Sequence, residues 1–286
     1  MSNASAGTRP PRHGLARVLS KLGLCSRSQG QSWVRAGRVR VNGKVVLDPE
    51  FPVVQGRDRI SVDEQAASQE ARVYIALNKP RGLVVSASDE QGRATVYSLL
   101  QDADLPWLGP VGRLDKASEG LLLLTNDTAW AAGITNPVSG KEKTYHVQVR
   151  GTPTDEVCQA VLRGIEDGGE MLAARRVSLL RQGPRHAWLE VVLDEGRNRH
   201  IRRMFGALGH DVVRLVRVAI GDLALGTLAK GAWRPLSPDE IAALRPDGKF
   251  RIPLVTYCAS AAHRADWPTV QTVRRIDPIN GKEPGS

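Results

Sequence analysis

Cysteine is scarce in this sequence, and its few copies are poorly spaced for a structural role. The 286 residues include three cysteines, Cys25, Cys158 and Cys258, which lie far apart and are odd in number. Neither a disulfide framework nor a zinc-binding spacing can be built from them. This excludes a small disulfide-stapled secreted protein and favours a reducing compartment, so we expect the protein in the cytoplasm.

Long apolar runs are absent as well. No stretch approaches the ~20 residues of a membrane-spanning helix, and residues 1–14 contain no apolar segment of the secretory-signal type. We therefore expect neither a membrane protein nor a secreted one. Hydrophobic residues make up 41% of the chain, which is enough for a sizeable core, and the length favours one large domain or two unequal ones.

The first 47 residues contain no acidic side chain. Nine of the 40 Lys and Arg residues lie there, and the other 31 nearly balance all 30 acidic residues, so almost the whole net charge of +10 belongs to this segment. A concentrated positive charge suits a polyanion, most simply nucleic acid. An anionic membrane surface would also suit it, but the apolar residues here fit a small core better than a broad amphipathic stripe.

Residues 14–63 are predicted to form one small basic domain. The apolar spacing predicts a helix over residues 15–22, and a serine at position 26 can cap a second helix that reaches residue 36. Valines then alternate on either side of Asn42-Gly43, which is the strongest short signal for a β-hairpin. A further strand is expected at residues 60–62.

Residues 73–245 are predicted to form a second domain of α+β class, with a mixed, largely antiparallel β-sheet flanked by a few helices. Strands are expected at 73–77, 83–85, 121–124, 144–149, 177–180 and 187–193, and helices at 154–164, 200–208 and 239–244. Residues 64–72 are polar and are expected to be a linker. The segments 1–13 and 246–286 are expected to be largely disordered.

The small domain resembles the RNA-binding module first named from a small-subunit ribosomal protein, the S-four type. Ser26-Arg27 at the second helix and the run Gly37-Arg38-Val39-Arg40-Val41-Asn42-Gly43 match its signature. The resemblance implies RNA binding, for which the candidate residues are Arg17, Lys21, Arg27, Arg35, Arg38, Arg40 and Lys44. The match departs at Gln29-Gly30-Gln31, where glycine should weaken the helix by about 1 kcal/mol relative to alanine.

Asp115 lies in a short polar loop directly before four consecutive leucines. A buried strand after the loop would fix its position, and the loop would leave the side chain reachable. For an isolated aspartate in such a loop, a hydrogen bond to its own backbone is the commoner outcome. Arg113 lies on the same side as Asp115 if the segment is extended.

Four arginines and a histidine fall within seven residues where a loop enters a predicted helix. They are Arg197, Arg199, His200, Arg202 and Arg203. Helix N-termini and arginine side chains both favour anions, although a solvated basic face is the plainer interpretation. Because Ile201 must be buried, at least one neighbouring arginine is drawn into a partly desolvated site, where it would keep a nearby carboxylate ionised.

Tyr145 lies on a half-buried predicted strand, where a tyrosine usually packs in the core. In an enzyme acting on nucleic acid, the same ring could stack on an extruded base.

Each of these signals is weak alone, but together they occur in a fixed order: Asn78-Lys79-Pro80-Arg81-Gly82, Gly112-Arg113-Leu114-Asp115, Gly120 to Asp127, Lys143-Thr144-Tyr145, Glu195-Gly196-Arg197-Asn198-Arg199 and Ile201-Arg202-Arg203-Met204. This order resembles the rRNA pseudouridine synthases of the RsuA type, which also carry the S-four-type module in front.

The resemblance implies an isomerase that uses Asp115 as its essential carboxylate. It also assigns a basic partner of Asp115 to Arg202, with Arg203 as the fallback, and base stacking to Tyr145. Substrate-pocket roles fall to Ile201, Arg113 and Arg203, RNA binding to Arg197 and Arg199, and a role in holding loops to Lys79. Thr128 and His200 depart from the residues usual at those positions.

The reaction that the resemblance implies needs no metal or other cofactor, because the uridine is only rearranged. The expected partner is ribosomal RNA or a pre-ribosomal particle, and a monomer is the default. Two alternatives stay open: a non-catalytic RNA-binding assembly factor, and a nucleosidase. A nucleosidase normally uses two carboxylates or a metal, and the nearest second carboxylates in the sequence are Glu119 and Asp127.

Overall fold

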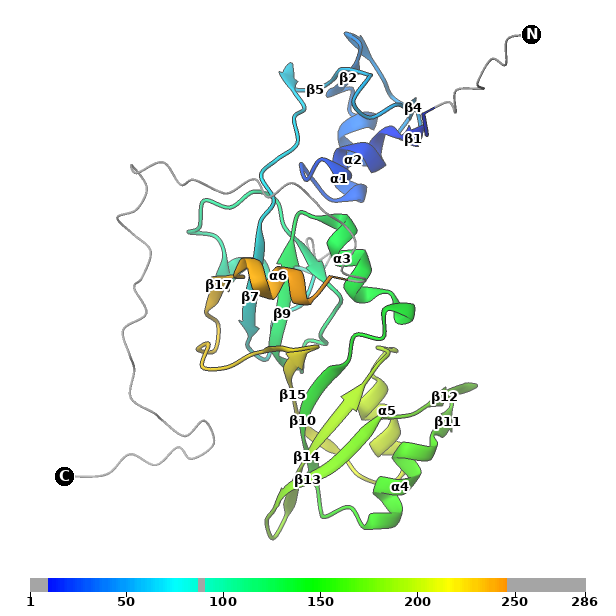
Figure 1. Ribbon diagram of the computed structural model, residues 1–286, viewed down its shortest axis with the longest axis vertical. Coiled ribbons are helices and arrows are strands. Elements are labelled where there is room, and N and C mark those ends of the chain that lie inside the picture. Colours follow the sequence, from blue (N-terminus) through cyan, green and yellow to red (C-terminus); the bar gives the residue numbers. More distant parts are fainter. Residues whose placement is uncertain (1–9, 87–90, 246–286) are drawn as a thin grey trace, which may run out of the picture. The chain divides into compact units, whose positions relative to one another are not determined.

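The computed structural model describes residues 10–86 and 91–245 (Figure 1). The disorder predicted for residues 1–9 and 246–286 therefore lies outside the described residues. The first described element, β1 (His13–Gly14), pairs with β4 (Pro52–Val53). His13 is thus ordered in a strand, and the prediction of disorder up to residue 13 is wrong at that residue.

The N-terminal domain consists of two helices and two small sheets. Helices α1 (Leu15–Lys21) and α2 (Arg27–Arg35) lie where the sequence predicts them. The larger sheet has the strand order β3-β2-β5-β6, and its members are β2 (Val39–Val41), β3 (Lys44–Val45), β5 (Ile60–Val62) and β6 (Gln65–Ala66). Because β6 lies inside the predicted linker 64–72, that linker is shorter than expected.

The structure explains why α2 has a glycine at position 30, where a helix-favouring residue would be expected. The residue is buried, and a Cβ atom there would lie 3.2 Å from the carbonyl oxygen of Ala16 and 3.3 Å from the Sγ atom of Cys25. Contacts this short are tighter than most side chains accept. The glycine therefore lowers the intrinsic helix propensity of α2 but allows close packing against α1.

Within the described residues, nine strands form one sheet in the second domain. The main path runs β13-β14-β10-β15-β9-β7-β17, with β16 added to β15 and β8 added to β9. The strands are β7 (Tyr74–Lys79), β8 (Gly109–Val111), β9 (Glu119–Thr125), β10 (Lys143–Arg150), β13 (Arg176–Gln182), β14 (His186–Leu193), β15 (Val212–Ile220), β16 (Leu223–Ala224) and β17 (Trp233–Pro235). The β9–β15 pair is parallel and the other pairs of these named strands are antiparallel. This confirms the predicted α+β class and the mixed, largely antiparallel sheet.

Strand β9 is the centre of the domain because it is buried on both faces. The helices of this domain are α3 (Thr128–Thr135), α4 (Asp155–Arg163), α5 (His200–Ala207) and α6 (Pro238–Ala243) (Figure 1). Leu121 and Leu123 share one apolar core with residues of α3 and α6, whereas Leu122 and Leu124 share the other core with residues of α4 and α5. The run of leucines therefore forms a rigid strand between two cores.

Two parts of the predicted pattern differ from the structure. Residues 83–85 do not form the expected strand, and Val84 makes only an isolated bridge with Thr95. The elements that the pattern did not predict include β15, the short hairpin of β11 (Ile165–Asp167) and β12 (Glu170–Leu172), and helix α3. Of these, β15 matters most, because it joins β10 to β9.

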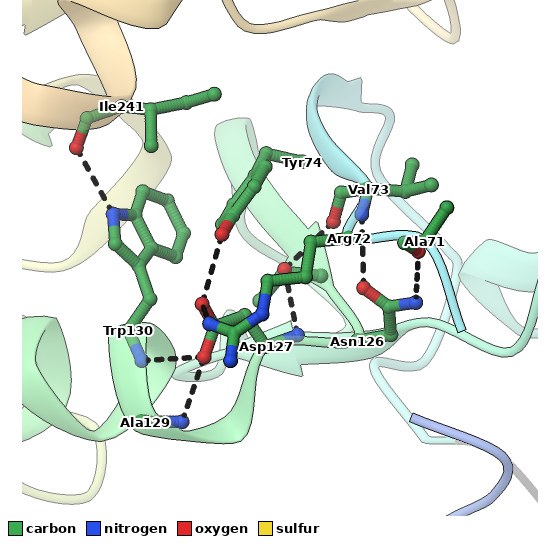
Figure 2. A network of polar contacts seen from close by, with 10 residues as sticks. Ala71, Arg72, Val73, Tyr74, Asn126, Asp127, Ala129, Trp130 and Ile241 are labelled. Carbon is green, nitrogen blue, oxygen red and sulfur yellow. Dashed lines mark hydrogen bonds and ion pairs between the residues drawn. The ribbon is translucent and has the colours of Figure 1, made fainter. Parts of the chain in front are cut away.

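A polar network around Asp127 fixes the end of β9 that lies away from Asp115 (Figure 2). One carboxylate oxygen accepts two amide hydrogen bonds from the first turn of α3, and the other accepts hydrogen bonds from Arg72 and from the Tyr74 hydroxyl, the latter at 2.8 Å. Thr128 is the first residue of α3 and does not need a left-handed backbone. Its departure from the usual glycine therefore leaves this turn intact.

Candidate active site

Asp115 lies in the loop between β8 and β9, and the backbone of this loop is held at four successive carbonyl groups. The carbonyl of Asp115 accepts a 2.9 Å hydrogen bond from the amide of Ser118. The carbonyl of Lys116 accepts a 2.8 Å hydrogen bond from the amide of Gly82. The first two carbonyls thus close the turn and tie it to the segment after β7.

Two cationic side chains hold the other two carbonyls. Arg202 donates from Nη2 to the carbonyl of Ala117 at 3.3 Å, and Lys79 donates from Nζ to the carbonyl of Ser118 at 2.8 Å. Lys79 is fully buried, so its hydrogen bond is shielded from competition by water. The sequence-based assignment of Lys79 to loop holding agrees with this contact.

The carboxylate of Asp115 is half-buried and accepts no hydrogen bond from any described residue. The turn is closed through the backbone instead, so the side chain does not take the self-capping role that is common for loop aspartates. Burial lowers the pKa of Lys79 to about 8 and also lowers the pKa of Arg202. The negative charge of Asp115 acts in the opposite direction on both pKa values. The geometry leaves one carboxylate free beside two positive charges.

Arg202, and not Arg203, is the arginine next to Asp115. Arg202 is half-buried, and its Nε has no hydrogen-bond partner among the described residues. The causes of its lowered pKa are burial first and the neighbouring positive charge of Arg199 second, with Asp115 in opposition. Arg203 instead forms ion pairs with Asp167 and Glu170 of the β11–β12 hairpin, which directs it away from the loop.

Tyr145 packs in the same apolar core as Leu114 and Ile201, the residues directly before Asp115 and Arg202 in the sequence. Its ring, Leu114 and Ile201 belong to one apolar cluster, with 8%, 7% and 3% of their surfaces exposed. Three segments far apart in the sequence therefore converge on this side of the sheet. The Tyr145 hydroxyl forms no hydrogen bond with any described residue.

Neither of the nearest second carboxylates is free. Glu119 is buried and accepts a bidentate hydrogen bond from Arg214, at 2.9 and 3.1 Å, and a 2.7 Å contact from Lys230. Burial acts to raise the pKa of Glu119, but these two cations outweigh it and lower the pKa overall. Asp127 caps α3. These residues therefore do not form the two-carboxylate arrangement that a nucleosidase normally uses.

The other residues expected around the site are less closely joined to it. Arg113 is exposed and has no hydrogen-bond or ion-pair partner in the part of the chain that the structure describes. Arg197 forms a 2.9 Å ion pair with Glu195. Arg199 is exposed and precedes α5 with a left-handed backbone, whereas His200 is buried, which lowers its pKa. Arg113 and Arg199 are thus both exposed to solvent.

The basic residues of the N-terminal domain are mostly available to solvent. Those exposed are Arg17, Arg27, Arg35, Arg38 and Lys44, and those half-buried are Lys21 and Arg40. Arg38 is partly engaged, because it pairs with Asp63 and stacks over the ring of Trp33 at 5.1 Å. The exposed group is a cationic surface that could meet a polyanion.

Sequence reasoning missed the charged residues of β15. Arg217 is buried and donates from Nε to the carbonyl of Leu121 at 2.7 Å, and Arg214 pairs with Glu119. Both lie in the otherwise apolar run 212–220. An arginine in such a run is itself a signal of a buried partner, and that signal could have identified the strand.

Within residues 10–86 and 91–245, no group of three or more His, Cys, Asp and Glu side chains is arranged to hold a metal ion. No helix in the same ranges is long and apolar enough to cross a bilayer.

Comparison with known proteins identifies two families. Residues 73–207 match the family described as RNA pseudouridylate synthase, and residues 14–60 match the S4 domain. The chain is 36% identical to the ribosomal large subunit pseudouridine synthase B of Bacillus subtilis (strain 168), over 81% of this chain and 95% of that protein. It is 35% identical to an uncharacterized RNA pseudouridine synthase of Aquifex aeolicus (strain VF5), over 80% and 92% of the two chains.

A solved structure extends the likeness to the fold. The crystal structure of a pseudouridylate synthase aligns with a TM-score of 0.58 and 32% identity, and covers 81% of this chain and 99% of that chain.

Proposed function

The chain belongs to the RNA pseudouridylate synthase family, and from that premise we propose that it isomerises one uridine of ribosomal RNA to pseudouridine with Asp115 as the essential carboxylate. The Asp115 loop is the observation that carries the proposal. Its four carbonyls are held by hydrogen bonds, while the carboxylate has no hydrogen-bond partner among the described residues and lies in the field of Arg202 and Lys79. The name of the Bacillus relative favours large-subunit RNA as the substrate.

The proposed reaction breaks the N1–C1′ bond of uridine and joins C5 to C1′. N1 gains a proton, C5 loses one to solvent, and the nucleotide as a whole is unchanged in composition and redox state. A carboxylate held by a rigid loop can attack C1′, act as a base on the ribose, or stabilise positive charge that develops at C1′. All three roles require Asp115 to stay in one place and to be reachable, which the restrained loop supports.

The neighbours of Asp115 supply orientation and electrostatics in this proposal. Arg202 holds the loop through the carbonyl of Ala117, and its buried Nε has no hydrogen-bond partner among the described residues. Tyr145 stacks on the extruded base, and Ile201 forms an apolar wall. Both side chains already pack in the core next to Leu114, which fixes their positions before the substrate arrives.

The target uridine must leave its stack to reach Asp115, at a cost of a few kcal/mol. Phosphate contacts can offset this cost. In the proposal, the exposed cations of the N-terminal domain, together with Arg197 and Arg199, hold ribosomal RNA while the second domain acts on one nucleotide. Action on ribosomal RNA would place the enzyme in the cytoplasm, alone or on a pre-ribosomal particle.

The test is release of tritium from ribosomal RNA labelled at C5 of uridine, for the wild-type protein and for Asp115→Asn. The expected result is stoichiometric release by the wild type and none by the variant, because the amide cannot replace the carboxylate. Free uracil among the products would indicate a nucleosidase. RNA binding without release by the wild type on both subunit RNAs would favour the non-catalytic alternative, and equal release by the two proteins would remove Asp115 from its role.

A further inference from the structure

A row of side chains crosses the sheet on the face opposite to Tyr145. In the registers of β13, β14, β10 and β15, Arg181 lies opposite Trp188, Trp188 opposite Gln148, and Gln148 opposite Arg214. Residues directly opposite each other in antiparallel strands project from the same face. The strand neighbours of Gln148 and Trp188 are buried in the core, namely Val147, Val149, Ala187 and Leu189, so this row belongs to the outer face of the sheet.

Trp188 is the aromatic centre of this row. Its ring is half-buried, and the guanidinium groups of Arg181 and Arg214 lie 5.3 and 5.8 Å from the ring centroid. Arg214 is held in place by its ion pair with Glu119. Arg181 is exposed and forms no ion pair with any described residue, so another planar group can take its place over the ring while the arginine moves to a nearby anion.

A surface cavity of about 570 Å³ opens beside the ring. Its lining consists of residues 181–186 at the end of the β13–β14 hairpin, together with Gln148 and Trp188. The volume falls within the range of about 300–1,000 Å³ that is typical of small-ligand sites. The cavity therefore has room for a nucleotide, with an aromatic wall, an amide and several donors around it.

The charge of this cavity fits one class of ligand. Its lining residues include Arg181, Arg185 and His186 and no acidic side chain. The acids on the same face of the sheet are already paired, since Glu190 lies 3.7 Å from Arg176 and Glu119 is bound by Arg214. Positive charge next to a stacking surface is the combination that binds single-stranded nucleic acid.

We propose that this cavity, the Trp188 subsite, binds an unpaired nucleotide of the RNA substrate outside the active site, with the base stacked on Trp188 and its phosphate held by Arg181 and Arg185. The inference rests on the proposed function, because it takes RNA as the substrate. The subsite is separate from the catalytic residues, which lie on the other face of the sheet with Tyr145. It therefore contributes to RNA affinity and to the choice of substrate, and not to the chemical step.

Direct contact is tested by photocrosslinking the full-length protein to a 4-thiouridine-substituted single-stranded RNA of about eight nucleotides, a length within the usual site size. Mass spectrometry of the digest should find the crosslink in the peptide that contains residues 181–188. Absence of that crosslink, with crosslinks elsewhere on the protein, would overturn the proposal. This measurement uses the wild type, so it does not depend on whether a variant folds.

The energetic role is tested with Trp188→Ala, Trp188→Phe and the control Arg163→Ala, which removes an exposed arginine of α4 from the other side of the sheet. Trp188→Ala should raise the Kd for the RNA at least about fivefold, as expected for loss of one stacked base, and raise KM without changing kcat. Trp188→Phe should recover most of the affinity, and Arg163→Ala should change neither quantity. An unchanged Kd for Trp188→Ala, or an equal loss for Trp188→Phe, would overturn the subsite.

Two further outcomes separate this proposal from others. If Trp188→Ala weakens binding of a ribosomal subunit but not of the naked RNA, the cavity binds a protein, and the proposal is wrong. Failure of the proposed function has a different signature, because RNA binding would still depend on Trp188 although the wild type releases no tritium.

Discussion

The buried ammonium group of Lys79 donates a 2.8 Å hydrogen bond to the carbonyl oxygen of Ser118, three residues after Asp115. Both side chains are inaccessible, with 0% and 1% of their surfaces exposed. Placing a lysine there costs desolvation energy, which is visible as a pKa lowered to about 8. The contact ties the end of β7 to the Asp115 loop. The desolvation cost of Lys79 thus lowers the stability of the fold but holds the loop that carries the candidate catalytic group.

The lowered pKa of Lys79 predicts a pH dependence of stability with a definite sign. Between about pH 8 and pH 10.5, the unfolded chain keeps the Lys79 proton longer than the folded chain does, so the free energy of unfolding rises with pH. Relative to Lys79→Met, which does not titrate, the wild type should gain up to about 3 kcal/mol across this range. Urea unfolding of both proteins from pH 7.5 to 10.5 measures the difference. A difference that stays constant with pH would contradict the assignment.

Gly120 is predicted to be irreplaceable because of a neighbouring backbone, and not only because of its own conformation. Its φ is +99°, and an added Cβ atom would lie 2.2 Å from the carbonyl oxygen of Arg217 in the adjacent parallel strand. Gly120→Ala should therefore cost more than about 3 kcal/mol. Gly82→Ala is the matched control, since Gly82 has the same φ of +99° but open space around it, and it should cost only about 1–2 kcal/mol. Equal losses in thermal unfolding would show that backbone strain alone is responsible.

The position of Asp115 could be predicted from sequence because the evidence for it is local. Four leucines in a row indicate a strand that is buried on both faces, and Leu121 to Leu124 are each fully buried. The hairpin at Asn42-Gly43 and the capped helix α2 are equally local, since each depends on residues within a few positions of one another.

The supports of the site were less predictable because they join distant residues. Arg214 and Glu119 are 95 residues apart, and nothing near either one indicates the other. The two arginines of β15 interrupt its apolar alternation, and each has a hydrogen-bond partner on β9: Arg214 binds Glu119, and Arg217 donates from Nε to the carbonyl of Leu121. The choice between Arg202 and Arg203, which are adjacent in sequence, likewise depended on which side of α5 faces the loop and which faces the β11–β12 hairpin.

The exposed cations of the N-terminal domain are predicted to set the salt dependence of RNA binding. Arg17, Arg35 and Lys44 are exposed and form no ion pair with any described residue. If all three neutralise phosphates, replacing them with glutamine should reduce the slope of log K against log salt by about 2 for single-stranded RNA. Fluorescence anisotropy at several salt concentrations measures the slope, with Arg163→Gln as a single-site control. A slope that does not change would mean that RNA phosphates are held elsewhere.

Substitutions of the two adjacent arginines of α5 are predicted to have different effects, one on kcat and the other on stability. Arg202 holds the carbonyl of Ala117 and acts on Asp115, so Arg202→Gln should lower kcat by about 100-fold or more, as is typical when a charge that stabilises the reacting centre is lost. Arg203 pairs with Asp167 and Glu170 instead, so Arg203→Gln should lower the midpoint of urea unfolding while kcat at saturating RNA stays within about threefold, below the effect of one catalytic group. Tritium release and urea unfolding on both variants test the contrast. If Arg203→Gln lost as much kcat as Arg202→Gln, Arg203 would belong to the active site. If Arg202→Gln kept normal turnover, Lys79 would be the cation that acts on Asp115.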